Sequence, residues 1–412
     1  MKILVAHNYY QQAGGEDLVF GDETALLESR GHEVDRLIVR NDAVDELSAT
    51  LGGKLRLAAG TIWSRRSAAE IADRVRKTGA QVVHFHNTFP LLSPAVYGAA
   101  RRAGAAVVQT LHNFRMLCPA ATFYRQGAVC EDCLGRLPLA GIRHACYRSS
   151  RATTAVAVAS IAAHRLLGTY RRSVDAYIAV SQFTREKYIE GGFPADRVHL
   201  KMNFIRNDPG AGAGDGGFAL FVGRLAPEKG ITTLLSAWRT LGSKIPLRIC
   251  GDGPMADEVK KAATENPAVT WLGRQPVAEV MKRMGQASFL VFPSTWYEGQ
   301  PRTILESLAC GTPIIASDLG AMIETVLDGQ TGCRFKPGQA AALAEAASRL
   351  LADPTRLAEM RQAARADFEA RFTADHAYQR LIEIYESALR RRHKPAALEA
   401  PSRPPDKMAA CP

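Results

Sequence analysis

No apolar stretch of the sequence is long enough to cross a membrane. The most apolar long segment, residues 152–168, is interrupted by His164 and Arg165 and falls short of the roughly 20 residues that a transmembrane helix needs. The first apolar run, residues 3–6, has the length of a strand and stops at His7, so no signal peptide is expected. We therefore expect a cytoplasmic protein. A peripheral contact with the inner face of the cytoplasmic membrane is a further expectation.

Cysteine is scarce, and eight cysteines among 412 residues are too few for a disulfide scaffold. Four of them share one segment with the spacing C-x11-C-x2-C-x12-C: Cys118, Cys130, Cys133 and Cys146. This spacing is compatible with a structural zinc ion held by four thiolates, with free thiols or an iron–sulfur site as the alternatives. In a reducing cytoplasm a metal is preferred over two disulfides.

Positive charge is in excess, with a formal net charge of +11. A polyanionic partner is therefore worth considering: nucleic acid, an anionic membrane or nucleotide phosphates. Helix-turn-helix signals, base-stacking motifs and zinc-finger histidine pairs are missing, which disfavours nucleic acid. Residues 101–172 contain eleven arginines and no lysine against two acidic residues. Such a basic, apolar-backed face, with Arg165, Arg171 and Arg172, suits an anionic lipid or a lipid-diphosphate-linked acceptor.

Short apolar strands alternate with amphipathic helices along most of the chain. This alternation predicts an α/β protein with two doubly wound parallel sheets, because strands that are covered on both faces are continuously apolar. The expected strands are 3–6, 32–39, 82–85, 106–111 and 176–180, then 219–222, 247–250, 270–272, 289–292 and 313–316. A ligand is expected in the cleft between the two sheets, at the carboxyl ends of their strands.

Glycine and proline divide the chain. Five glycines fall among residues 207–217, which predicts a flexible linker. We therefore expect the following organisation: a first domain over 1–206 with a cysteine-rich insertion at about 115–150, the linker over 207–217, a second domain over 218–375, a closing helix over 376–390 and a disordered tail over 391–412.

Two carboxylates eight positions apart give the strongest chemical signal. Glu298 lies in the loop after an expected strand, and Pro301 fits the first position of a helix that carries Glu306. A helix start suits a phosphate, because its N–H groups are free and its dipole end is positive. A carboxylate one turn after the helix start, such as Glu306, can accept hydrogen bonds from the diol of a ribose. A carboxylate in the loop, such as Glu298, can accept them from the hydroxyl groups of a sugar ring. The alternative is a helix start enriched in acidic residues for dipole reasons.

Arg224 and Lys229 follow the first strand of the second domain. A guanidinium and an ammonium at this position form a diphosphate clamp, and Gly223 and Gly230 allow close backbone approach. The alternative is a turn with solvated side chains.

Gly14 and Gly15 follow the first strand of the first domain and could let backbone N–H groups approach an anion. They do not belong to a G-x-G-x-x-G fingerprint, and no G-x-x-x-x-G-K-[ST] phosphate loop is present. Histidines also end two strands of this domain. His84 and His86 resemble a metal pair without an adjoining third ligand, and His84 is expected to be a satisfied core residue. His112 is the better candidate for a cleft residue.

Together these motifs resemble the family 4 retaining glycosyltransferases. The resemblance rests on the glutamate pair, the G-R-L-x-P-E-K-G loop at 223–230, the glycines at 251 and 253, Gly14-Gly15 and the T-x-H at 110–112, over about residues 1–390. It implies the GT-B architecture, in which two Rossmann-like domains face each other across a cleft. The first domain would then bind the acceptor, and the second would bind the nucleotide-sugar donor.

The resemblance also implies roles for single residues. Glu306 would bind the donor ribose, Glu298 the hydroxyls of the donor sugar, and Arg224 and Lys229 the diphosphate. His112 would lie beside the sugar, and Asp252 would lie near the nucleobase. The backbone around the sugar and phosphate would come from Gly14, Gly15, Gly299, Gln300, Pro301 and Arg302.

The expected activity is transfer of a sugar from a nucleoside-diphosphate sugar to a glycan or lipid-linked acceptor, in cell-envelope or extracellular polysaccharide synthesis. No D-x-D metal site is apparent, so we expect no cofactor for catalysis. Relatives of this kind retain the anomeric configuration by front-face attack, with His112, Glu298, Arg224 and Lys229 as the catalytic residues. A nucleophilic Glu298 is the alternative mechanism. A nucleotide-sugar epimerase of the same shape and, less favoured, a nucleic-acid-binding protein are the alternative functions, while the pyridoxal-binding lysine of a phosphorylase is not recognisable.

Overall fold

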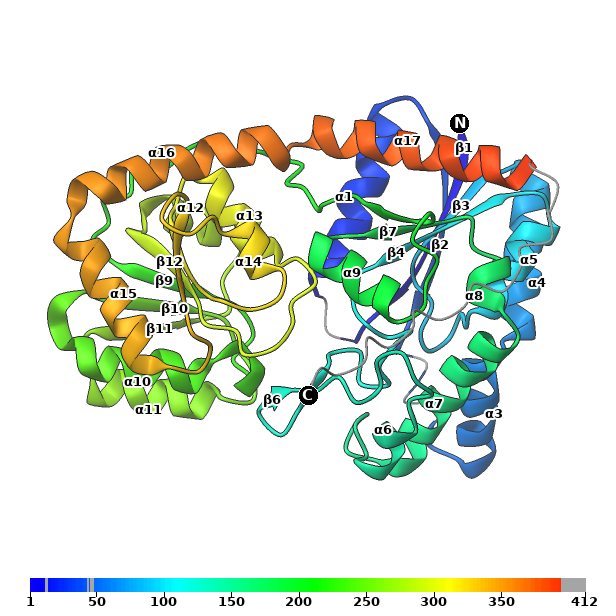
Figure 1. The fold of residues 1–412 in the computed structure, drawn as a ribbon, viewed down its shortest axis with the longest axis horizontal. Coiled ribbons are helices and arrows are strands. Elements are labelled where there is room, and N and C mark those ends of the chain that lie inside the picture. The colour runs from blue at the N-terminus through cyan, green and yellow to red at the C-terminus, as the bar shows by residue number, and fades with distance from the viewer. Residues whose placement is uncertain (12–13, 43, 45–47, 394–412) are drawn as a thin grey trace, which may run out of the picture.

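The structure is a computed structural model that describes residues 1–11, 14–42, 44 and 48–393. It consists of two α/β lobes, with a long pair of helices running along the upper edge of both lobes (Figure 1). Each lobe is built on a six-stranded sheet in which every pair of neighbouring strands is parallel. The predicted α/β class with two doubly wound domains is therefore confirmed.

The sheet of the first lobe has the order β2-β1-β3-β4-β7-β8. Its strands are β1 (Lys2–Tyr9), β2 (Glu33–Arg40), β3 (Val82–Asn87), β4 (Ala106–Leu111), β7 (Ala176–Ala179) and β8 (Val198–Leu200). The chain leaves β1 to one side for β2 and returns to its other side for β3. This reversal creates a crevice at the carboxyl end of β1, where such folds bind ligands.

Helices cover both faces of this first sheet. They include α1 (Gly15–Ser29), α4 (Arg65–Thr78), α5 (Ala95–Arg102), α8 (Thr169–Arg172) and α9 (Gln182–Glu190). Three more helices, α3 (Leu51–Ile62), α6 (Leu139–Arg143) and α7 (Arg151–Leu166), pack against one another below the sheet (Figure 1). Successive residues of β1 point to opposite faces, so Ile3 and Val5 pack toward α1 while Leu4 and Ala6 pack toward α4 and α5.

The sheet of the second lobe has the order β11-β10-β9-β12-β13-β14, the strand order typical of a Rossmann fold. Its strands are β9 (Ala219–Val222), β10 (Leu247–Cys250), β11 (Val269–Gly273), β12 (Phe289–Phe292), β13 (Ile314–Ser317) and β14 (Gly332–Phe335). The order reverses between β9 and β12, so the loops that follow these two strands border the crevice.

The helices of the second lobe also lie on both faces of its sheet. They are α10 (Ile231–Leu241), α11 (Ala256–Glu265), α12 (Val277–Gln286), α13 (Arg302–Ala309), α14 (Met322–Thr325), α15 (Ala340–Ala352) and α16 (Pro354–Arg371), with 3-10 turns η1 (Pro227–Lys229) and η2 (Gly242–Lys244). Among the described residues, none of the helices has the length and apolarity that crossing a membrane requires.

The glycine-rich segment 207–217 is docked on the second lobe, which differs from the flexible linker that we expected. The backbone N–H groups of Gly212, Gly214 and Gly216 donate to the carbonyls of Cys310, Gly285 and Gln286. A Cβ atom on Gly212 would lie 2.2 Å from the backbone of Gly285. The glycines therefore serve close backbone approach here.

The last helix, α17 (Ala374–His393), returns to the first lobe and crosses its sheet (Figure 1). Its apolar side packs on the first-lobe core through Leu381, Ile384, Tyr385 and Ala388. This helix begins two residues before the predicted position 376 and continues to 393, beyond the predicted end at 390. The rest of the predicted tail, 394–412, lies outside the described residues.

The cysteine-rich insertion at about 115–150 has little regular structure. It contains a hairpin of β5 (Tyr124–Arg125) and β6 (Ala128–Val129) and the short helix α6. Six of the seven non-glycine residues that adopt a positive φ in the described chain fall within it. The insertion projects below the first sheet toward the second lobe (Figure 1).

Candidate functional site

A cavity of about 1260 Å³ lies between the two lobes. Its first wall comes from the turn after β1, the residues after β4 and the cysteine-rich insertion, and its second wall from the loops after β9 and β12. The turn after β1 and the loops after β9 and β12 border the points where the two strand orders reverse, so the two crevices share one space. This volume exceeds the roughly 300–1000 Å³ of ordinary small-molecule sites, which leaves room for two substrates.

Most of the predicted site residues line this cavity. They are Gly14, Gly15, His112, Arg224, Lys229, Glu298, Gly299, Gln300, Pro301 and Arg302. Asp252 and Glu306 are not among its lining residues. Asp252 closes its own turn, because its Oδ1 accepts the N–H of Gly253 at 2.8 Å. Their predicted contacts to the nucleobase and the ribose stay predictions.

Glu298 is the centre of the second wall. It is 8% exposed, and its Oε1 accepts from Lys229 Nζ at 2.6 Å, Ser294 Oγ at 2.8 Å and Trp296 Nε1 at 2.6 Å. The ammonium of Lys229 also lies 5.2 Å from the centre of the Trp296 ring, close enough for a cation–π contact. Because all three donors meet the same oxygen, Oε2 remains an acceptor for a hydroxyl group from the cavity.

Gly230 explains how Lys229 reaches Glu298. Gly230 has φ +73°, and a Cβ atom there would lie 1.9 Å from the carbonyl oxygen of Pro293. Only glycine therefore lets the turn η1 pack against the loop after β12. The sequence reading assigned Gly230 to close approach of a ligand, whereas here the approach is between two loops of the same wall.

Arg224 is held more loosely than Lys229. Its guanidinium pairs with Glu228 in the same turn, and its side chain is 52% exposed. A guanidinium with this much freedom can turn to a phosphate, while the ammonium of Lys229 is fixed. The two cations of the predicted diphosphate clamp therefore differ in their surroundings: Arg224 is half exposed, and Lys229 is paired with the buried Glu298.

The loop at 298–302 is fastened to the first lobe. The backbone N–H of Asn203 donates to Gln300 Oε1 at 2.5 Å, and Arg302 pairs with Asp22 of α1 at 2.5 Å. A Cβ atom on Gly299 would lie 2.8 Å from the carbonyl oxygen of His112. The side chains of Gln300 and Arg302 are thus used to join the lobes, which the sequence reading did not foresee.

Glu306 lies one helical turn after Arg302 in α13, and its Oε1 accepts a hydrogen bond from Arg302 Nε at 3.0 Å. Burial raises the pKa of Glu306, and the charge of Arg302 opposes the rise.

On the first wall, Gly14 precedes α1 and Gly15 begins it. The N–H of Gly14 donates to Asp17 Oδ2 at 2.7 Å, and Asp17 Oδ1 meets His7 Nε2 at 2.6 Å. The amide of Gly14 is therefore already used, which reduces the predicted anion contact to Gly15 and the first turn that follows it. A Cβ atom on either glycine would meet nothing within 4 Å, so the protein itself does not require glycine here.

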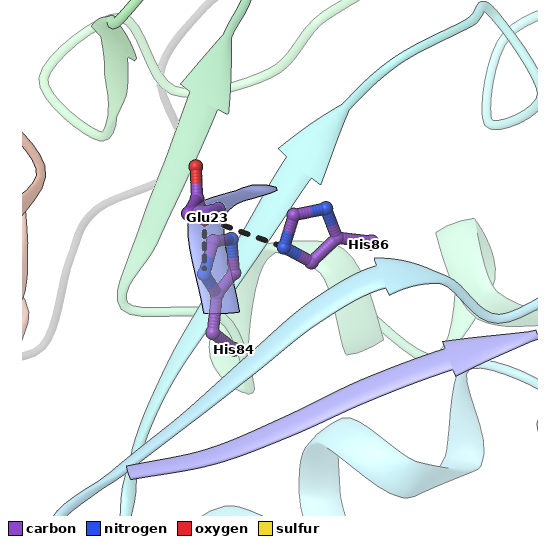
Figure 2. Close-up of side chains that lie close together, drawn as sticks. All are labelled: Glu23, His84 and His86. Carbon is purple, nitrogen blue, oxygen red and sulfur yellow. Dashed lines mark ion pairs between the residues drawn. The ribbon is translucent and has the colours of Figure 1, made fainter. Parts of the chain in front are cut away.

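His112 ends a chain of buried polar groups inside the first lobe. Its Nε2 lies 2.9 Å from His86 Nδ1, and His86 Nε2 lies 3.3 Å from Glu23 Oε1. His84 Nδ1 approaches the same carboxylate at 3.1 Å. Figure 2 shows Glu23 from α1 with both histidines of β3 aimed at it.

Glu23, His84 and His86 have the spacing of a metal site. Their ligand atoms all lie within 4.8 Å of one another, and no other His, Cys, Asp or Glu group of three or more among the described residues does so. However, Lys201 Nζ lies 2.6 Å from Glu23 Oε2, and both side chains are almost fully buried. An ammonium in this place repels a metal cation, so the cluster is an internal ion pair. The expectation that His84 is a satisfied core residue agrees with its bonds to Tyr385 and Thr110.

The sequence reading missed Glu16, which follows Gly15 and lines the cavity. Burial, with the nearby charge of Asp17, raises its pKa to about 8, although hydrogen bonds from Tyr10 and Asn113 oppose the rise. Its Oε1 is buried and without a hydrogen-bond partner among the described residues. Perturbed carboxyl groups of this kind are typical of functional sites. A carboxylate in the first turn of a helix is ordinary, so only its burial could have revealed it.

Arg115 was also missed. Its guanidinium stands over the rings of Phe89 and Tyr147, 4.3 Å and 4.8 Å from their centres, and all three side chains line the cavity. This stack joins the cysteine-rich insertion to the loop after β3. It makes the first wall both cationic and aromatic.

The four clustered cysteines carry no disulfide. They line one small cavity inside the insertion, separate from the large one. Cys250, Cys310 and Cys333 stand apart from them, as expected, and Cys411 lies outside the described residues.

Two family models match the chain in succession. The model described as Glycosyltransferase Family 4 matches residues 19–206, and the model described as Glycosyl transferases group 1 matches residues 206–367. The boundary between the matches coincides with the boundary between the two lobes.

Two curated proteins illustrate the sequence similarity of this chain to named enzymes. The alpha-maltose-1-phosphate synthase of Mycolicibacterium smegmatis is 30% identical over 246 residues, which are 52% of this chain and 63% of that protein. The 2-deoxystreptamine glucosyltransferase of Streptomyces kanamyceticus is 27% identical, over 79% of this chain and 82% of that protein. For the first curated relatives, the match covers only 44–63% of their own length.

Solved structures show the same fold. Anabaena HepE in complex with UDP superposes with a TM-score of 0.65 at 18% identity, over 94% of this chain and 100% of that one. The sucrose-phosphate synthase of Thermosynechococcus elongatus superposes with a TM-score of 0.69 at 17% identity, over 94% and 98%. At such identities the likeness concerns the fold.

Proposed function

The chain belongs to the family 4 glycosyltransferases of GT-B architecture, and from that premise we propose that it transfers a sugar from a nucleoside-diphosphate sugar to a glycan or lipid-linked acceptor. The observation that carries this proposal is the meeting of two strand-end crevices in one cavity. The Lys229–Glu298 pair of one lobe and His112 of the other both line that cavity.

The donor would lie on the second wall. Lys229 and Arg224 would neutralise the leaving diphosphate, so a divalent cation is not needed for this task. The Oε2 atom of Glu298 would accept a hydroxyl group of the donor sugar. Complexes of HepE with UDP and with UDP-glucose support a nucleotide-sugar donor in this fold.

Retention of the anomeric configuration is part of the proposal. In front-face attack the leaving phosphate takes the proton of the acceptor hydroxyl, so no protein base is required. Glu298 suits an accepting role better than a nucleophilic one, because three donors, one of them a cation, hold its Oε1.

The test is a donor panel of UDP-, GDP- and ADP-sugars incubated with acceptor extracts, with the product anomer read by NMR. K229A and E298Q should lower kcat by about 100-fold or more, as expected for removal of a transition-state charge partner. The matched control K260A removes an exposed lysine of α11 and should keep the wild-type rate. Wild-type rates in both site variants, or sugar interconversion without acceptor, would overturn the transferase assignment in favour of the epimerase.

The acceptor would be presented at an anionic membrane in cell-envelope or extracellular polysaccharide synthesis. Leucines of α6 and the end of α7 are exposed, Leu139 by 60%, Leu166 by 79% and Leu167 by 55%. Exposed leucines next to arginines are typical of surfaces that enter the lipid interface. Arg143 and Arg172 are exposed beside them.

Arg165 is not part of this face, which corrects the sequence expectation. Its guanidinium donates to the carbonyls of Arg136 and Met116, so it braces the insertion. Removing its charge would test folding and not membrane binding.

Liposome sedimentation tests the membrane contact. Binding should rise with phosphatidylglycerol content, fall with salt, and weaken at least several-fold in L139S/L166S. The control V277S removes an equally exposed residue, 66%, from the second lobe. Equal binding by L139S/L166S and V277S would contradict the assignment.

A further inference from the structure

The cysteine-rich insertion brings four thiols to one place from three separate segments. Cys118 follows β4, Cys130 and Cys133 follow the hairpin, and Cys146 follows α6. All four line the same small cavity. A Cβ atom on Gly141 would lie 2.4 Å from Pro119, so α6 is pressed against the turn of Cys118.

The backbone of this insertion is costly to hold. Ala121, Phe123, Gln126, Ala145 and Arg148 have φ between +48° and +68°. Residues with a side chain pay about 1–3 kcal/mol each for such a conformation, and it persists only where the surroundings impose it. Leu117 and Phe123 anchor one side of the insertion in the first-lobe core. The two-residue strands and the five-residue helix add little regular structure, so a further constraint at the cysteines would stabilise the rest.

The thiols are electrostatically coupled and poorly solvated. Burial raises the pKa of Cys133 to about 12, and Cys118, Cys146 and Cys130 add to the rise. Burial and neighbouring thiols also raise the pKa of Cys146. The mutual influence of the four thiols agrees with their shared cavity, and four cysteines are a common ligand set of structural zinc.

Binding of one metal ion would require the sulfur atoms to move closer together. No three of these sulfur atoms lie within 4.8 Å of one another. Tetrahedral zinc with Zn–S bonds of about 2.3 Å needs sulfur atoms about 3.8 Å apart. Moving one cysteine side chain between staggered rotamers shifts its sulfur by about 3 Å, so sulfur atoms that line one cavity can approach one another by side-chain rotation.

We propose that Cys118, Cys130, Cys133 and Cys146 bind one zinc ion as a closed structural site that fixes the insertion. The site would stabilise the first wall of the large cavity, because Arg115, Tyr147 and Arg148 of the insertion line it. It would also secure a contact between the lobes, since Tyr124 Oη lies 3.2 Å from Thr295 Oγ1. The metal site does not depend on the proposed transferase activity.

The test is metal analysis of the full-length protein after dialysis, by inductively coupled plasma mass spectrometry. One zinc per chain is expected in the wild type, less than about 0.2 in C130S and C133S, and one again in the controls C310S and C333S. Alkylation of the denatured, unreduced protein should count eight free thiols. Iron in place of zinc, two disulfides, or metal-free protein with eight free thiols would each overturn the proposal. The wild-type measurement decides even if the variants fail to fold.

A second inference comes from the buried chain that ends at His112. Burial and the neighbouring charge of His84 lower the pKa of His86 to about 3, so its ring is neutral and carries one N–H. His86 Nε2 lies 3.3 Å from Glu23 Oε1, and neither atom has a hydrogen-bond partner among the described residues, so the proton belongs on Nε2, where the carboxylate attracts it. His86 Nδ1 is then an acceptor, and His112 Nε2 must donate to it.

We infer that Glu23 and His86 are positioning residues that fix the tautomer of His112, leaving its Nδ1 as a hydrogen-bond acceptor at the cavity. Lys201 holds the carboxylate in place. On the proposed function, that acceptor meets a hydroxyl group of a substrate sugar. The tautomer itself can be measured without any activity, so the two claims can fail separately.

Imidazole nitrogen shifts of His112, measured by long-range proton–nitrogen NMR, test the inference. The wild type should show the Nε2-protonated tautomer, and H86F should lose it and lower kcat at least about 10-fold with an unchanged donor KM. The control H84F replaces an equally buried ring of β3, whose hydrogen bonds go to Tyr385 and Thr110 and not to His112. An Nδ1-protonated wild type, or equal shifts and equal kcat losses in both variants, would refute the positioning role.

Discussion

The most informative stability experiment replaces Lys201 by methionine. Lys201 and Glu23 form an ion pair at 2.6 Å with side chains that are 2% and 1% exposed. Methionine fills most of the lysine volume but leaves the carboxylate buried without its cation. Breaking such a buried pair costs about 3–5 kcal/mol. At about 2–4 °C per kcal/mol for a domain of this size, Tm should fall by about 6–20 °C.

The charge of Glu23 also gives the effect a pH dependence. Burial alone would raise its pKa, but Lys201 and then His84 hold it well below the ordinary value of 4.5. A lowered pKa stabilises the fold above about pH 4.5, and this stabilisation is lost as pH falls through the folded value. K201M should therefore be most destabilised at neutral pH and should approach the wild type in acid.

Thermal and urea unfolding of K201M, E23Q and E23Q/K201M, followed by circular dichroism, provide the measurement. The double variant should be more stable than K201M, because neither charge remains buried alone. A K201M loss below about 1 kcal/mol, or strictly additive losses in the double variant, would refute the buried-pair reasoning.

Three further outcomes are expected. G230A should misplace Lys229, because the added Cβ atom would meet Pro293, and it should raise the donor KM at least 10-fold. The control G242A lies at φ +58° with open space around it. It should change only the stability of the protein, by about 1 kcal/mol. E16Q should gain stability over the wild type as pH rises from 5 to 9, because a pKa raised to about 8 makes the wild type lose stability over that range; parallel Tm profiles would contradict this. D22N should weaken the contact with Arg302 between the lobes and raise the donor KM a few-fold without changing the Tm of the first lobe, as steady-state kinetics and calorimetry can show.

The sequence predicted the elements whose signal is local. Three expected strands of the second lobe, 219–222, 247–250 and 289–292, match the observed bounds residue for residue, because a buried strand carries its own apolar pattern. The helices α3 and α4 and the edge strands β8 and β14 were not predicted. Edge strands are short and partly exposed, so their apolar run is too brief to stand out.

Residues of the candidate site were predicted where they directly follow a strand. They were missed where only a tertiary contact brings them to the site. The carboxyl ends of β9 and β12 brought Arg224, Lys229 and Glu298 to one wall as expected. Glu23 and Lys201 are 178 positions apart, and neither stands at a motif, so no spacing could join them to His112. The pairing of Arg302 with Asp22 depends on how the lobes meet, which local pattern does not encode.

The distribution of charge explains why these cations act locally. Lys229 is paired with Glu298 and Arg224 with Glu228, each within its own wall, so the second wall presents almost no net field at a distance. On the proposed function, the diphosphate of the donor would compete with a carboxylate for each cation, and it could do so because it offers two charges at once. Exposed pairs such as Arg224–Glu228 are worth at most about 1 kcal/mol, whereas Lys229 is held by a buried acceptor. On the proposed function, Arg224 would thus be the cation that exchanges partners, and Lys229 would be the fixed point against which a donor is aligned.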